Sequence, residues 1–157
     1  MNRAATRTST TPNSSAMEPI LDHVQVTVKS MAVAVPFYDR LMPLLGYDPE
    51  KRVEATVDGH LHVVNYSHPK LDFAINSPRE AFASDEVHRR KPGAVHHLAF
   101  RVETRAEVDR LHVELQAIGA PIVSGPQLHP EYGPNYYAVF FKDLEGIKYE
   151  LVSTAAG

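Results

Sequence analysis

Apolar and polar residues alternate over residues 21–28, where Val24, Val26 and Val28 share one face of a predicted strand. Ser30 is a candidate N-cap for the helix that follows, and Gly46 ends that helix. Turn signals such as Asp58-Gly59 then separate three more predicted strands, over 52–57, 60–66 and 71–75. The first half of the chain therefore predicts the order strand, helix and three strands.

The second half repeats this order. A strand over 95–102 is followed by Thr104 and Glu107, which form a capping box for a helix that stops at Gly119. The pattern then predicts a segment near Ile122 and strands over 136–141 and 147–152. A shift of 74 residues aligns His23 with His97, and a shift of 76 residues aligns Ala74 with Glu150.

We therefore expect an α+β fold of two βαβββ modules that form a curved mixed sheet around a cleft. The modules span 19–78 and 94–154, a polar connector spans 79–93, and together they make one domain. Residues 1–18 are rich in Ser, Thr and Asn and are expected to form a disordered tail. The basic run Arg89-Arg90-Lys91 in the connector is interpreted as solvated surface.

The composition excludes several classes of function. The 157 residues include no Cys, so neither disulfides nor thiolate metal sites can form. The net charge of −3 comes without a basic stripe, which argues against a nucleic-acid partner. No stretch is long enough to span a membrane or to serve as a secretory signal, and we expect a cytoplasmic protein. Nine His residues are the unusual feature.

One face of the predicted strands is entirely apolar and is expected to lie beneath the helices. The opposite face must be wet or line a cleft, because its polar groups would be costly to bury unpaired. This polar face carries His23, Gln25 and Thr27; Asp72, Ala74 and Asn76; His97, Ala99 and Arg101; Lys148 and Glu150.

Three residues of the polar face predict a metal site. His23 and His97 hold equivalent positions in the two modules, and Glu150 lies on a closing strand. Two imidazoles and one carboxylate suit one divalent ion such as Fe, Mn, Co, Ni or Zn.

The other His residues are weaker candidates. His60 and His62 can reach the cleft only if their strand turns that face inward, and surface placement is favoured. His96 is expected to point away from His97. Solvent exposure is expected for the remaining four, His68, His88, His112 and His129.

Several motifs resemble the vicinal oxygen chelate superfamily, which includes glyoxalases, extradiol dioxygenases, epimerases, fosfomycin-modifying enzymes and bleomycin-binding proteins. The resemblance runs over about 20–153. Its motifs are Leu21-Asp22-His23-Val24, Leu45-Gly46-Tyr47, His97-Leu98-Ala99-Phe100 and Asp143-Leu144-Glu145-Gly146 with Tyr149-Glu150.

The resemblance implies metal ligands at His23, Ala74, His97 and Glu150. Ala74 cannot bind a metal, so the chain fits the three-ligand members of the family unless Asp72 supplies a fourth ligand. Those members place a Tyr near the metal where this chain has Phe140, and Tyr136 has the same strand parity.

These observations predict a metal-dependent lyase, isomerase or dioxygenase acting on a small substrate with vicinal oxygens. Gln25, Asp72, Arg101 and Tyr136 are candidates for orienting the substrate or moving a proton. The alternative functions are a metal-free drug- or metabolite-binding protein of the bleomycin-resistance type and a catalytically silent relative. The resemblance also implies a homodimer.

Overall fold

A computed structural model describes residues 19–157, and the predicted tail lies outside this range. The first module contains β1 (His23–Thr27), α1 (Met31–Leu44), β2 (Arg52–Val57), β3 (Leu61–Tyr66) and β4 (Asp72–Asn76). The second contains β5 (Leu98–Arg101), α2 (Arg105–Ala117), β6 (Ile122–Leu128), β7 (Tyr137–Lys142) and β8 (Lys148–Ser153). Two short 3₁₀ helices, Pro49–Lys51 and Glu80–Phe82, complete the described structure.

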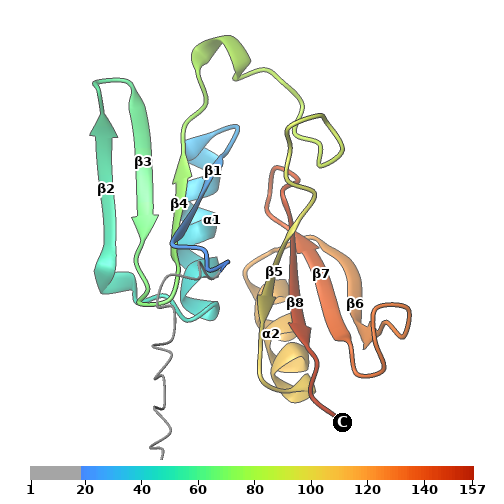
Figure 1. The fold of residues 1–157 in the computed structure, drawn as a ribbon. Coiled ribbons are helices and arrows are strands. Elements are labelled where there is room, and N and C mark those ends of the chain that lie inside the picture. Colours follow the sequence, from blue (N-terminus) through green and yellow to red (C-terminus); the bar gives the residue numbers. More distant parts are fainter. Residues whose placement is uncertain (1–18) are drawn as a thin grey trace, which may run out of the picture.

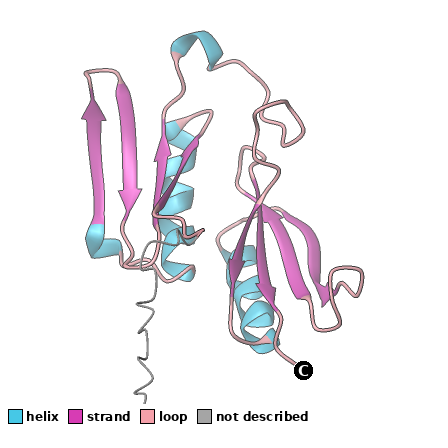
Figure 2. Cartoon of the chain, in the orientation of Figure 1, coloured by secondary structure: helices cyan, strands magenta, loops and turns pink. Residues whose placement is uncertain are grey.

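Each module folds into one four-stranded mixed sheet (Figures 1 and 2). The strand orders are β1-β4-β3-β2 and β5-β8-β7-β6. In each sheet the first strand pairs in parallel with the last, and the other pairs are antiparallel. The α+β fold of two βαβββ modules is confirmed, with a separate sheet in each module.

The strand register confirms the internal repeat. Gln25 pairs with Ala74 between β1 and β4, and Ala99 pairs with Glu150 between β5 and β8. These are the pairs that the repeat predicts, since a shift of 74 residues carries Gln25 to Ala99. Ala74 and Glu150 therefore hold equivalent positions, and only the second module has a carboxylate there.

The helix caps follow the predicted chemistry. The Ser30 hydroxyl accepts a hydrogen bond from the Val33 amide, and the Thr104 hydroxyl accepts one from the Glu107 amide. Gly46 and Gly119 follow the two helices with φ of 93° and 81°, a conformation that glycine adopts without strain. Within residues 19–157, no helix is long and apolar enough to cross a membrane.

One hydrophobic core joins the two modules. The apolar faces of both sheets and the inner faces of α1 and α2 belong to the same buried cluster. At its centre Tyr38 of α1 stacks on Phe73 of β4, and Phe73 contacts Phe100 of β5 and Tyr149 of β8. The modules therefore share their stabilisation and form one cooperative unit.

Buried polar groups also connect the modules. The Tyr38 hydroxyl donates to Asp143 Oδ2 at 2.8 Å and lies 2.6 Å from the Tyr149 hydroxyl. Since Tyr38 has one proton and gives it to Asp143, the Tyr149 hydroxyl must donate to Tyr38. Burial raises the pKa of the Asp143 carboxyl, and the amide of Ile147 is among the donors that oppose this rise. The two hydroxyls, the carboxylate and the Ile147 amide thus all have hydrogen-bonding partners in the buried core.

We predict that Tyr38→Phe destabilises the protein because it leaves the Tyr149 hydroxyl and Asp143 Oδ2 without their buried partner. The free energy of unfolding, measured by urea titration and circular dichroism, should fall by about 1–3 kcal/mol. Tyr47→Phe is the matched control, since Tyr47 is 5 % exposed and its hydroxyl makes no hydrogen bond among the described residues. Equal effects of the two substitutions would contradict the role given to the buried network.

Candidate functional site

The buried carboxylate of Glu150 is the centre of the candidate site. Glu150 lies on β8, on the polar face of the second sheet, yet it is only 1 % exposed. Its Oε1 accepts a hydrogen bond from the Tyr136 hydroxyl at 2.5 Å, and its Oε2 lies 3.2 Å from His97 Nε2. A buried carboxylate is costly unless it has polar partners, and these two contacts give each carboxylate oxygen one.

Tyr136 stays protonated at neutral pH. Burial, together with the hydrogen bond to Glu150, raises the pKa of the Tyr136 phenol to about 12. The positive charge of Arg101 lies near enough to oppose this rise. Tyr136 therefore acts as a hydrogen-bond donor to the carboxylate, and Arg101 belongs to the same neighbourhood.

A chain of hydrogen bonds reaches His97 from the connector. Arg89 Nε donates to His96 Nε2 at 3.2 Å, and His96 Nδ1 lies 2.7 Å from His97 Nδ1. Arginine can only donate, so a neutral His96 carries its proton on Nδ1 and gives it to His97. His97 then holds its own proton on Nε2, which faces Glu150.

His96 stays neutral at pH values where an ordinary histidine begins to protonate. Burial and the positive charges of His97, Arg89 and Lys148 lower its pKa. The expectation that His96 points away from His97 is wrong, because β5 begins only at Leu98 and strand alternation does not hold before it. His96 therefore fixes the orientation of the His97 ring.

His129 was expected in solvent, and this expectation is also wrong. Its side chain is 13 % exposed, and its ring packs edge-on to Tyr136 and Phe140 and stacks on Tyr132. Its Nδ1 contacts Glu131, whereas Nε2 is buried without a partner. The loop between β6 and β7 folds back over the sheet, and no periodic signal in the sequence predicts such a return.

The remaining predicted residues lie on the first sheet. His23 precedes Val24 on β1 with 65 % of its side chain exposed, and its Nδ1 lies 2.8 Å from Asp22. Asp72 on β4 accepts hydrogen bonds from the amide of His68 and from Asn65, and His23 is near enough to help lower its pKa. Gln25 donates to Asn76.

The predicted site residues thus form two groups. The first-sheet group consists of His23, Gln25 and Asp72, and the second-sheet group consists of His97, Arg101, Tyr136 and Glu150. Among residues 19–157, no three His, Asp or Glu side chains are close enough together to hold one metal ion. His97 and Glu150 meet as predicted, and His23 does not join them within one chain.

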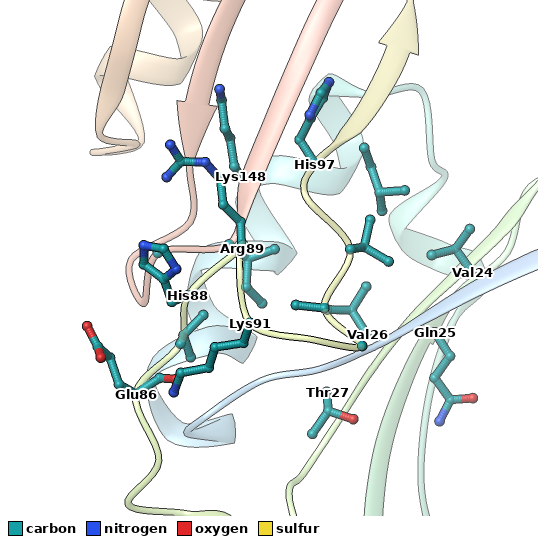
Figure 3. A pocket seen from close by; sticks show the side chains of 17 residues that line it. Val24, Gln25, Val26, Thr27, Glu86, His88, Arg89, Lys91, His97 and Lys148 are labelled. Carbon is teal, nitrogen blue, oxygen red and sulfur yellow. The ribbon is translucent and has the colours of Figure 1, made fainter.

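A cavity of about 380 Å³ lies between the modules, next to His97 (Figure 3). Its walls come from β1, from the connector and from the starts of β5 and β8. Arg89 and Lys91, which were interpreted as solvated surface, line this cavity. The connector therefore contributes to the site and does not simply join the modules.

The chain is similar to one protein family over most of its length. The family model described as the Glyoxalase/Bleomycin resistance protein/Dioxygenase superfamily matches residues 20–151. The uncharacterized protein YqjT of Bacillus subtilis is 28 % identical over 134 residues, which cover 85 % of this chain and 98 % of YqjT.

Solved structures show the same fold. A candidate glyoxalase from Bacillus halodurans has a TM-score of 0.66 and 29 % identity, covering 87 % of this chain and 96 % of its own. The fosfomycin resistance protein FosX of Mesorhizobium loti has a TM-score of 0.56 and 14 % identity, covering 87 % of this chain and 93 % of its own. At that identity the likeness to FosX concerns the fold alone.

We predict that Tyr136→Phe lowers the free energy of unfolding by about 1–3 kcal/mol, because the buried Glu150 loses its hydroxyl donor. The matched control is Tyr132→Phe, which keeps the ring beside His129, and Tyr132 is 65 % exposed. That control should change stability by less than about 0.5 kcal/mol in the same urea titration. A neutral Tyr136→Phe substitution would show that the 2.5 Å contact does not support the carboxylate.

Proposed function

Because the chain belongs to the glyoxalase, bleomycin resistance protein and dioxygenase superfamily, we propose that it is a metal-dependent enzyme acting on a small substrate with vicinal oxygens. The observation that carries the proposal is the buried Glu150 carboxylate, held between the His97 imidazole and the Tyr136 phenol. A buried charge with dedicated partners adds nothing to the hydrophobic core, and such groups cluster at functional sites.

His97 and Glu150 would fit a divalent ion once Nε2 of His97 gives up its proton, with His97 and His96 then carrying their protons on Nδ1 and Nε2, respectively. Their nitrogen and oxygen atoms lie 3.2 Å apart, as two donors do when each is about 2.1 Å from one ion. An imidazole and a carboxylate are ligands that Fe, Mn, Co, Ni and Zn all accept. The second-sheet group thus supplies two of the three ligands expected from the sequence.

We assign the third ligand to His23 of a second copy. His23 is exposed on β1, the edge strand of the first sheet, where a second molecule can approach it. In a symmetric dimer, the first-sheet group of each copy would face the second-sheet group of the other, and two equal sites would form. The homodimer and the metal site are then one proposal.

The chain's own residues prepare this site. A divalent ion bound there supplies a Lewis acid that stabilises negative charge on the substrate oxygens. Tyr136, whose phenol has a pKa of about 12, keeps its proton and donates it in a hydrogen bond to the Glu150 carboxylate. This hydrogen bond fixes the Glu150 side chain in place. Arg101, whose guanidinium now donates to Thr154, can turn to a substrate carboxylate or phosphate.

Phe140 lies where three-ligand relatives are expected to carry a Tyr. It packs edge-on to His97 and His129 and offers no proton donor. The nearby phenol is that of Tyr136, the residue before β7, which donates to the Glu150 carboxylate. We therefore propose Tyr136 as the hydrogen-bond donor of this site.

The second candidate is a metal-free protein that binds a drug or metabolite in the cavity between the modules. The observation that favours it is the incomplete donor set within residues 19–157 of one chain. The two functions differ in one measurable property, since the binding protein needs no metal.

We predict that His23→Ala and His97→Ala chains regain metal binding when they are combined in one dimer. Each variant alone should bind no divalent ion tightly, while the parent dimer binds about two ions. In the mixed dimer, one site receives both substitutions and the other receives none, so about one ion per dimer should remain. The two chains carry different affinity tags, neither of which contains histidine, because histidine tags bind metal themselves. The mixed dimer is purified through both tags in turn, and its metal content is measured by elemental analysis.

The control dimer combines His97→Ala with Glu150→Ala. Both residues belong to the second-sheet group, so each site loses one ligand and no ion should be retained. An empty mixed dimer beside a metal-loaded parent would place His23 outside the site. A parent protein that binds no divalent ion would favour the binding protein instead.

A further inference from the structure

Among the described residues, the side chains that line the cavity between the modules carry more positive than negative charge. Arg89, Lys91 and Lys148 line it, and Glu86 is the one acidic side chain among the described residues that do so. The Lys91 ammonium donates a hydrogen bond to the main-chain carbonyl of Glu86. The cations that remain to bind a ligand are Arg89 and Lys148. Within residues 19–157, neither of these two side chains forms an ion pair.

The two free cations lie at one rim of the cavity, beside His97. Figure 3 shows the ends of the Arg89, Lys148 and His97 side chains in the upper part of the view, away from Thr27 and Gln25. Arg89 is held there through His96, and this contact uses only its Nε and leaves both terminal nitrogens free for a ligand. Lys148 lies with its Nζ 4.5 Å above the Phe140 ring.

The inner walls of the cavity are apolar. Its apolar lining residues include Val24 and Val26 of β1, and Val95, Leu98 and Ile147 of the second module. Val95 is 68 % exposed, so an apolar guest would cover a side chain that now contacts water. The volume of about 380 Å³ is within the range of small-molecule sites and has room for a body of one or two rings.

We propose that this cavity binds a small organic anion, with its apolar body between β1 and β5 and its carboxylate at Arg89 and Lys148. Two cations at the rim and apolar walls below them complement the two ends of such a molecule. A neutral molecule of the same shape leaves the cations without a partner, and a small inorganic anion leaves the walls empty. The binding needs no metal. That the bound anion is also the substrate, with its carboxylate next to His97, rests on the proposed function.

The test compares 1-naphthoate with 1-naphthamide, which differ in charge and hardly in shape. Each is titrated into ¹⁵N-labelled, EDTA-treated protein while the amide signals of Val26, Val95, Leu98 and Ile147 are followed. We expect naphthoate to bind about 3- to 10-fold more tightly than naphthamide at low salt, and the difference to shrink as salt is added. Because metal is removed first, the outcome is independent of the proposed metal site.

Variants locate the carboxylate. Arg89→Gln and Lys148→Gln should each weaken naphthoate binding severalfold and leave naphthamide binding unchanged. The matched controls are Arg110→Gln on α2 and Lys51→Gln, which alter exposed residues that do not line the cavity. The dispersion of the same spectra reports whether each variant is folded.

The proposal is overturned by any of three results. Naphthoate and naphthamide bind equally well, the shifted signals lie away from the cavity, or the control substitutions weaken naphthoate as much as Arg89→Gln and Lys148→Gln do.

Discussion

The buried hydroxyl of Tyr38 fixes how the two modules sit against each other, and the site depends on that arrangement. Tyr38 belongs to the first module, and its partners Asp143 and Tyr149 belong to the second. The aromatic core around Phe73 could slide, because apolar contacts are not directional, whereas these hydrogen bonds have one geometry. These hydrogen bonds hold together the two modules whose strands β1 and β5 both line the cavity.

Glu150 is a buried charge that its equivalent position in the first module does not have. Ala74, its equivalent in the first module, is buried at 6 % exposure without any charge to compensate. Glu150 at 1 % exposure requires Tyr136 and His97 beside it, and His97 in turn requires His96. Equivalent positions of the repeat thus differ in charge, and only the second module surrounds this position with polar partners.

Periodicity and the repeat were sufficient to predict the elements, the apolar faces beneath the helices and the meeting of His97 with Glu150. The opposite face was predicted only in part, because Ala138, Phe140 and Val152 form a small buried apolar cluster there. They failed where the backbone leaves regular structure. His96 precedes β5, and His129 returns in a loop, so neither follows strand alternation. The separation of His23 from His97 was beyond this reasoning, because sequence equivalence places residues within each module and says nothing about the distance between modules.

The start of α1 is bound by Glu145, a residue near the other end of the chain. Glu145, in the turn before β8, accepts hydrogen bonds from the amides of Lys29 and Ser30, more than 100 positions earlier in the chain. Tyr38 likewise has its hydrogen-bonding partners, Asp143 and Tyr149, more than 100 positions later in the chain. The first module therefore leaves the ribosome with the Ser30 cap of α1 in place but without the Glu145 acceptor for the Lys29 and Ser30 amides. Its aromatic face stays uncovered until the second module is synthesised. The two ends of the chain thus stabilise each other, in a protein whose finished fold is a simple repeat.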